Sequence, residues 1–503
     1  MPTTSAQSVR RGRRPSTAMV RTQTSVTSSR RIASNFAFLS LAEVACRSVS
    51  VVVTLLLTQR LGRGGFGRIE FGFNVVFWLV LIVRDGFEVI AARETARHPR
   101  LLRPLVNHIL GVKIALASVL YAALWLASSL AIGEAEERGV LRVYGLLLFT
   151  TAFGLDFAYR GIERMGLVAV SLVIRTIVYA LGIVLLVQTG TELIRIPQCL
   201  VCGEAIGIAI VWVCYASRFG VPRPSLGSRF LRVILRRGQP ILMIHLAQTV
   251  LTTIDLMVVG FLAPWNDGGL YSAPQRLIAA VVTFGLIFQQ VVFPTLSRGW
   301  RLDAEASRRS LDRCVALFAP AFVPIAVGAT ILSGSIVAFL YPADYAGAST
   351  LLAIGIWRAP LLAIAFLYQG ALIAFNREAV ASRVFFLFAG LSPIAVAVGL
   401  TAAGLPGASG AMVLVALGLC VTTYIQLRTD GRAPVWHHHL AKPLLASVLM
   451  AAAAIPLARI HVLAGVFGGG LVYLVALHLF GASPLDEMRS LVCCKASPDR
   501  NPA

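Results

Sequence analysis

The sequence predicts an all-α, polytopic membrane protein with about fourteen transmembrane helices, arranged as two six-helix lobes plus two C-terminal helices. Three observations predict this class. Hydrophobic residues make up 57% of the 503 residues and charged residues only 14%. The mean hydropathy of +0.78 is far more apolar than that of a soluble domain. Fourteen apolar runs are long enough to cross a bilayer, which takes about 20 helical residues, and basic residues alternate between scarce and abundant in successive loops.

The apolar runs set the expected helices. In chain order they cover about 36–59, 69–90, 107–130, 142–160, 166–187, 196–217, 239–263, 275–297, 314–340, 349–374, 383–404, 408–427, 441–459 and 462–480. The glycine-rich turn LGRGGFG at 61–67 separates the first two runs. A similar turn, containing Gly268 and Gly269, follows the seventh run. This echo indicates an internal repeat that pairs helices one to six with helices seven to twelve, related by an axis along the membrane normal.

Basic residues give the orientation. With a cytoplasmic N-terminus, the tails and loops on the cytoplasmic side hold 32 of the 45 Lys and Arg residues, whereas the opposite loops hold 8. Cytoplasmic loops are enriched in Lys and Arg in this way. We therefore expect a multi-pass membrane protein with both termini in the cytoplasm.

These runs and charges also divide the chain. We expect a disordered basic N-terminal tail at 1–34, an N-lobe at 35–217, a basic cytoplasmic linker at 218–238, a C-lobe at 239–427, an extra helix pair at 441–480 and a cytoplasmic tail at 481–503. The tail is rich in Arg, Ser and Thr and contains no acid, so it cannot bury enough apolar surface to fold. An organelle transit peptide is the alternative interpretation of that composition.

The sequence argues against an enzyme. The loops on the outer side are about 4–14 residues long, too short to hold an acceptor and catalytic groups, and no P-loop, HExxH or nucleophile-elbow pattern occurs. Eight cysteines are present, but Cys199 and Cys202 form a C-x-x-C without a second pair at zinc-ligand spacing. We expect no metal and no cofactor, and no nucleic-acid partner.

Charges within the apolar runs are the candidate functional residues, because insertion of one costs roughly 2.5–3.5 kcal/mol. Glu43 and Arg47 lie four residues apart on one face of the first helix. They either neutralise each other, or Arg47 faces a central cavity. Arg84, Asp85 and Glu88 come near the cytoplasmic end of the second run, where snorkelling to the interface explains them more simply than a place at a cavity entrance.

Two arginines lie in mid-span without a nearby acid in the sequence. Arg175 is in the fifth run, and Arg358 is in the tenth, just before Pro360, which prevents a regular helix there. Each needs either an acid from another helix or an anionic ligand. A planar guanidinium suits a diphosphate because it binds oxyanions through two parallel hydrogen bonds.

Two lone acids also lie at depth, Glu204 in the sixth run and Asp255 in the seventh. Each is either an ion-pair partner for one of the arginines Arg47, Arg175 and Arg358, or a site for a coupling proton or Na⁺. Burial favours the protonated form of a carboxyl group, as a proton carrier requires.

Several segments together resemble a known family. They are Asn35 at the start of the first helix, LGRGGFG, DGFEVIAARETAR at 85–97, LDFAYRGIERMGLVAV at 155–170 and GQPILMIHLAQTVLTTIDLMVVGFLAPWNDGGLYSAPQRL at 238–277. Over about 35–480 the chain resembles the oligosaccharide flippases of the O-antigen and capsular type, in the multidrug/oligosaccharidyl-lipid/polysaccharide exporter superfamily.

The resemblance implies two lobes around a cationic central cavity, with Arg47, Arg175 and Arg358 as the counterparts of its arginines. It implies a cargo of lipid-linked oligosaccharide on polyprenyl diphosphate, moved from the cytoplasmic to the outer leaflet of a bacterial inner membrane for polysaccharide export. A polysaccharide polymerase and glycosyltransferases would be the partners. The alternatives are a cation-coupled drug exporter of the same architecture and, from another class, a membrane-embedded glycosyltransferase or ligase.

Overall fold

A computed structural model describes residues 17–84, 88, 91, 94–95, 98–162, 164–188, 192–299 and 304–481. Every regular element in these ranges is helical. The elements of the first half are α1 (Thr17–Arg84), η1 (Pro99–Leu101), α3 (Leu102–Ala131), α4 (Ala135–Gly145), α5 (Leu147–Phe153), α6 (Asp156–Gly161), α7 (Met165–Leu186) and α8 (Arg195–Phe219). Those of the second half are α9 (Ser228–Leu262), α10 (Trp265–Gly299), α11 (Ala304–Ile331), α12 (Ser333–Leu340), η2 (Ala343–Tyr345), α13 (Ala348–Gly355), α14 (Arg358–Ala374), α15 (Glu378–Thr429), α16 (Trp436–Ile460) and α17 (Val462–Leu479).

The number of membrane spans follows from two overlong helices. Twelve segments among the described residues are long and apolar enough to cross a membrane, and two of them, Leu41–Arg84 and Glu378–Thr429, have 44 and 52 residues. At 1.5 Å per residue, each is about twice the roughly 30 Å of a bilayer core. Each also turns at a glycine with left-handed φ, Gly62 (+64°) and Gly404 (+64°). Dividing both at these turns gives fourteen spans, and the predicted fold class is confirmed.

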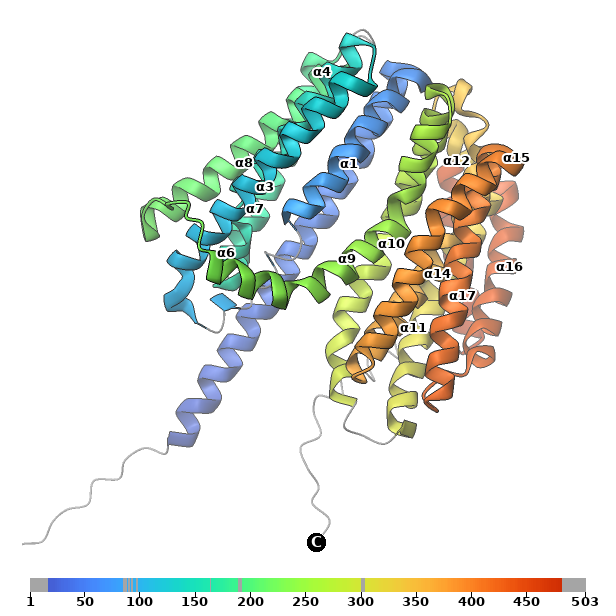
Figure 1. The fold of residues 1–503 in the computed structure, drawn as a ribbon. Helices are drawn as coiled ribbons and strands as arrows, with labels where there is room; N and C mark the ends of the chain where they lie inside the picture. The colour runs from blue at the N-terminus through green and yellow to red at the C-terminus, as the bar shows by residue number, and fades with distance from the viewer. Residues whose placement is uncertain are drawn as a thin grey trace, which may run out of the picture.

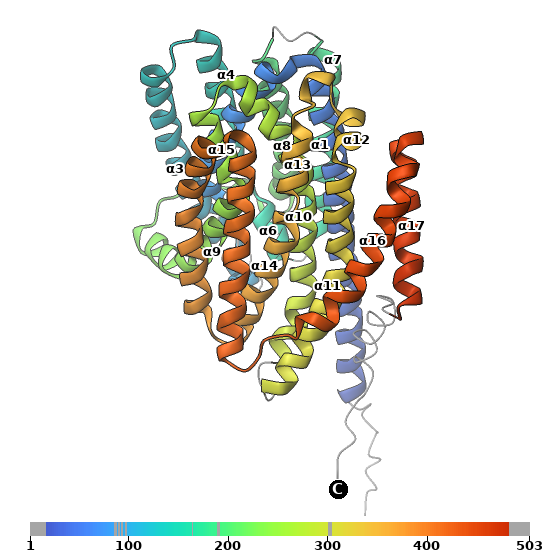
Figure 2. The same ribbon diagram turned by 90° about the vertical axis from the view of Figure 1, so that its right-hand side faces the viewer.

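The helices form two bundles with a peripheral pair (Figure 1). In the N-lobe, α1 packs against α7, and α7 packs against α8. In the C-lobe, α15 packs against α9 and α14, and α14 packs against α10. The helices α16 and α17 pack on each other, and α16 contacts α11, at the outside of the C-lobe (Figure 2). The two lobes meet where α1 packs against α10.

The two glycine turns that suggested the internal repeat lie against each other at this junction. A Cβ on Gly67 would collide with the backbone oxygen of Trp265 and would lie 2.8 Å from the backbone nitrogen of Gly269. A Cβ on Gly269 would in turn collide with the backbone oxygen of Arg63. The backbones of the two lobes are therefore in direct contact at the end of the bundle that holds Gly62, which we call the Gly62 end.

Helix α1 begins much earlier than expected. It begins at Thr17, inside the 1–34 stretch for which disorder was predicted, and residues 1–16 lie outside the described ranges. Extending an existing helix adds one hydrogen bond per residue without a new nucleus, so a polar segment without Pro or Gly can continue a long span. Figure 1 shows this part of α1 projecting beyond the other helices.

The expected linker at 218–238 is also partly helical. Helix α9 begins at Ser228, and only about 220–227 form the connection between the lobes. In Figure 1 the first turns of α9 run across the bundle before the helix turns along it. The predicted cytoplasmic tail at 482–503 lies outside the described ranges.

Two spans are broken, and both breaks bring charged residues to helix ends. The run predicted at 142–160 is part of a segment split into α4, α5 and α6, with Gly154 and Leu155 between the last two. The tenth predicted helix is split into α13 and α14 at Ile356 and Trp357. Pro360 cannot donate a backbone hydrogen bond, and it lies in the first turn of α14, where none is needed.

Candidate functional site

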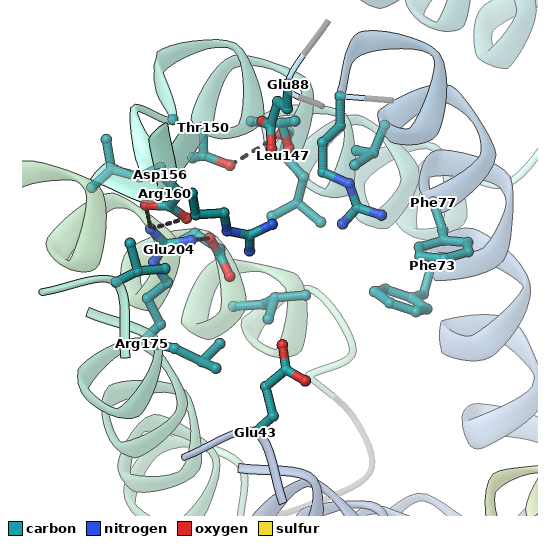
Figure 3. Close-up of a pocket in the computed structure, with 18 of the residues that line it drawn as sticks. Glu43, Phe73, Phe77, Glu88, Leu147, Thr150, Asp156, Arg160, Arg175 and Glu204 are labelled. Atoms are coloured by element: carbon teal, nitrogen blue, oxygen red, sulfur yellow. Dashed lines mark hydrogen bonds and ion pairs between the residues drawn. The ribbon is translucent and has the colours of Figure 1, made fainter. Parts of the chain in front are cut away.

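A cavity within the N-lobe extends toward the end of the bundle opposite Gly62, where Arg84 and Arg160 line it. It has a volume of about 780 Å³. Its walls come from α1, α5, α6, α7 and α8, with His245 of α9 as the C-lobe contribution. The ionisable residues that line it are Arg84 and His245 and, labelled in Figure 3, Glu43, Glu88, Asp156, Arg160, Arg175 and Glu204.

Arg175 is held by side chains from three directions. Its Nη1 donates to Oε2 of Glu204 at 3.2 Å, and its Nη2 donates to both carboxylate oxygens of Asp156 at 3.2 Å. Its Nε donates to Oγ of Ser171 at 3.1 Å. Two carboxylates therefore share one guanidinium. The break between α5 and α6 makes this possible, because it turns Asp156 toward α7.

Two further arginines, Arg84 and Arg160, line the same cavity. Arg160 is exposed and forms no hydrogen bond or ion pair within the part of the chain that the structure describes. Figure 3 shows its side chain near those of Asp156 and Glu204, inside the cavity. Glu88 accepts a 2.8 Å hydrogen bond from the buried ammonium of Lys113, which lies behind the cavity wall. Arg160 is thus a guanidinium whose donors are open to a ligand.

The cavity is not cationic overall, contrary to what the resemblance implied. Three arginines and four carboxylates line it. Lys113 behind Glu88 brings the cations and anions to equal numbers. The aromatic rings of Phe73 and Phe77, stacked with their centroids 5.9 Å apart, form part of the opposite wall. The lining thus combines oxyanion donors, carboxylate acceptors and an aromatic face.

Arg358 lies elsewhere, in a buried cluster of the C-lobe. Its Nη1 donates to Oδ2 of Asp255 at 2.7 Å, and its Nη2 donates to Oε1 of Gln275 at 2.9 Å. The same Oδ2 accepts from the hydroxyl of Tyr271 at 2.9 Å. The Arg358 side chain is 3% exposed and that of Asp255 is 0% exposed. Neither residue lines a described cavity, so the geometry favours the ion-pair alternative for both.

The two charges predicted in the first helix, Glu43 and Arg47, lie in different surroundings. Glu43 is half-buried and lines the cavity, whereas Arg47 is exposed and does not. No ion pair joins them within the described part of the chain. The structure therefore does not bring Arg47, Arg175 and Arg358 together. Of these three arginines, only Arg175 lines the cavity.

Comparison with known proteins gives the family. A family model described as "Polysaccharide biosynthesis protein" matches residues 32–300, more than half of the chain. The chain belongs to this polysaccharide biosynthesis protein family. The expected resemblance is confirmed at that level. Among curated proteins, no match is found.

Solved structures confirm the fold of this polysaccharide biosynthesis protein. A structure of the lipid II flippase MurJ in an inward closed conformation has a TM-score of 0.69 at 15% identity, covering 90% of this chain and 99% of that one. An inward-facing multidrug resistance MATE family transporter of the MOP superfamily has a TM-score of 0.65 at 13% identity, covering 76% and 94%. The Vibrio cholerae MATE transporter VcmN (D35N mutant) has a TM-score of 0.52 at 15% identity, covering 81% and 98%. These likenesses show the fold that this multi-pass membrane protein shares with the three structures.

Sequence reasoning did not place Arg84 or Arg160 among the binding residues. Both lie at helix ends, where a charge is equally compatible with lipid headgroups and with a cavity mouth. One signal could have found them. Arg84, Asp156 and Arg160 all lie at span ends on the same side of the membrane, and helix ends on one side can converge on one opening.

Proposed function

We propose that this polysaccharide biosynthesis protein is a flippase that moves a lipid-linked oligosaccharide, carried on polyprenyl diphosphate, from the cytoplasmic to the outer leaflet by alternating access. The observation that carries the proposal is the mixed lining of the 780 Å³ cavity. Arginine forks suit a diphosphate, carboxylates accept hydrogen bonds from sugar hydroxyls, and aromatic rings offer apolar faces to a sugar ring.

The orientation follows from the basic loops. Arg84 and Arg160 line the cavity at the end of the bundle where the basic loops lie, which is the cytoplasmic end under the positive-inside rule. A substrate made in the cytoplasm and embedded in the inner leaflet of a bacterial inner membrane would enter there. Glycosyltransferases and a polysaccharide polymerase are the expected partners of this transport step.

Arg175 and Arg160 have different proposed roles in this account. Arg160 has open donors and makes the first contact with the diphosphate. Arg175 binds it in competition with Asp156 and Glu204, because all three of its nitrogens already donate to side chains. The buried Arg358 supports the C-lobe and does not contact the substrate.

The cation-coupled drug exporter is kept as the second candidate because four carboxylates line the cavity. Cells that depend on this chain for surface glycan distinguish the two functions. We expect Arg160→Gln to abolish surface glycan and to leave lipid-linked oligosaccharide in the cytoplasmic leaflet, with efflux of the cation ethidium unchanged. Arg142→Gln is the matched control. The Cζ of Arg142 lies 3.7 Å from the centroid of the Trp125 ring, and Arg142 does not line the cavity. Normal surface glycan in Arg160→Gln cells, or ethidium efflux that depends on the protein, would contradict the flippase proposal.

A further inference from the structure

A second, smaller cavity continues the first toward the lobe junction. It has a volume of about 210 Å³ and shares five lining residues with the larger cavity, namely Phe73, Leu172, Arg175, Leu200 and Glu204. Its far end is formed by Glu70 of α1 and Arg276 of α10. A ligand group that leaves the Arg175 region toward the Gly62 end therefore reaches Arg276.

Two guanidinium groups, Arg175 and Arg276, line the smaller cavity, and each pairs with a carboxylate that also lines it, Glu204 and Glu70 respectively. The hydroxyls of Ser50, Thr54 and Thr176 already donate to backbone carbonyls of their own helices. Tyr144 and Tyr179 also line the cavity. Hydroxyl and guanidinium groups both donate hydrogen bonds to phosphate oxygens. The Nε of Arg276 is buried and has no hydrogen-bond partner in the described part of the chain. A buried donor without a partner is costly, so an unused guanidinium N–H beside a cavity points to a ligand.

Arg276 also ties the two lobes together. It belongs to the C-lobe, and its Nη2 lies 2.7 Å from Oε2 of Glu70 in the N-lobe. The Glu70 side chain is 7% exposed. Further toward the Gly62 end, Arg63 of α1 pairs with Asp344 of η2 at 3.5 Å. Gly67 and Gly269, whose backbones touch, also lie at this junction. The Glu70–Arg276 pair is therefore the part of the junction that a ligand in the cavity can reach.

We propose that Arg276 is a second binding residue for the anionic headgroup and that its capture from Glu70 opens the Gly62 end. This inference rests on the proposed function. A diphosphate carries more negative charge than one carboxylate and offers more acceptor oxygens, so it competes effectively for the guanidinium. Loss of the Glu70–Arg276 pair removes an ion pair that joins the lobes beside the cavity. The substrate thus releases the contact that blocks its exit.

The test uses the full-length chain in nanodiscs, with its native cysteines replaced and spin labels on Gly133→Cys and Gly334→Cys. Both positions lie near the Gly62 end, and a Cβ at either meets open space. The probe is farnesyl diphosphate, with farnesol as the neutral control. Probe affinity and the label-to-label distance are measured for wild type, Glu70→Gln, Arg276→Gln and Arg63→Gln.

Four results are expected. Farnesyl diphosphate lengthens the distance in wild type, and farnesol does not. Glu70→Gln lengthens it without probe and binds the probe at least as tightly as wild type. Arg276→Gln also lengthens it without probe but binds the probe about tenfold more weakly or worse, as loss of a charged hydrogen bond predicts. Arg63→Gln keeps wild-type affinity, because Arg63 lines neither cavity.

The outcomes separate this inference from the flippase proposal. If wild type does not bind farnesyl diphosphate, the proposed function itself fails. If wild type binds it while the distance stays fixed, or if Arg276→Gln binds it as tightly as Glu70→Gln does, the anion-operated contact is overturned and the flippase proposal stands.

Discussion

Replacing Arg358 distinguishes most clearly between a structural role and a ligand-binding role for a buried arginine. Replacing it with Ala leaves the Asp255 carboxylate, which is 0% exposed, with the Tyr271 hydroxyl as its one remaining donor among the described residues. Breaking a buried ion pair by removing one partner costs about 3–5 kcal/mol, because an uncompensated charge remains in a low-dielectric interior. We expect Arg358→Ala to lower the free energy of unfolding by that amount. Surface glycan should fall only in proportion to the protein that remains folded in the membrane.

The double variant Asp255→Asn with Arg358→Gln is the matched control. It removes both charges but keeps amide groups that can donate and accept among Tyr271 and Gln275, so most of the lost stability should return. Denaturant titration of the purified protein in detergent measures stability, and glycan export per folded molecule measures function. If Arg358→Ala is as stable and abundant as wild type but exports no glycan, Arg358 contacts the substrate and the structural role is refuted.

Two further predictions concern the lobe junction and the shared guanidinium. Gly269→Ala should force the lobes apart at the Gly62 end, because its Cβ meets the backbone of Arg63 and overpacking costs about 1–3 kcal/mol. The distance between spin labels at Gly133→Cys and Gly334→Cys measures this separation. The control is Gly268→Ala, whose Cβ meets nothing within 4 Å and which should leave the distance unchanged. Equal effects of Gly269→Ala and Gly268→Ala would contradict the close contact. The double variant Asp156→Asn with Glu204→Gln should free Arg175 and tighten the binding of farnesyl diphosphate about tenfold. Titration calorimetry measures this affinity. Weaker binding would mean that the two acids help to hold the ligand.

The membrane spans were predictable because length and apolarity suffice to define them. The turn at Gly62 was predictable from LGRGGFG, since a left-handed turn favours glycine. The helix that begins at Thr17 was not, because its polar residues carry no periodic apolar signal. The first broken span was also hidden, since the apolar run at 142–160 does not reveal the separate helix that begins at Asp156.

For a different reason, the sequence could not predict which buried charges pair with each other. Arg175 finds Glu204 across 29 residues, and Arg358 finds Asp255 across 103 residues. Sequence established that each arginine needed an acid or an anion, but only the packing of helices decides which. The same limit applies to Arg160, because a charge at a span end faces lipid, solvent or a cavity according to its neighbours in space.

Transport in a purified system tests the central claim most directly. The protein is reconstituted into liposomes with a fluorescent oligosaccharide on undecaprenyl diphosphate, and an external quencher reports how fast the labelled headgroup crosses the bilayer. The account predicts faster crossing than in protein-free liposomes. It also predicts loss of that gain in Arg160→Gln and no gain for the same oligosaccharide on a neutral lipid. Crossing as slow as in protein-free liposomes, or equal crossing of the diphosphate and neutral lipids, would contradict it.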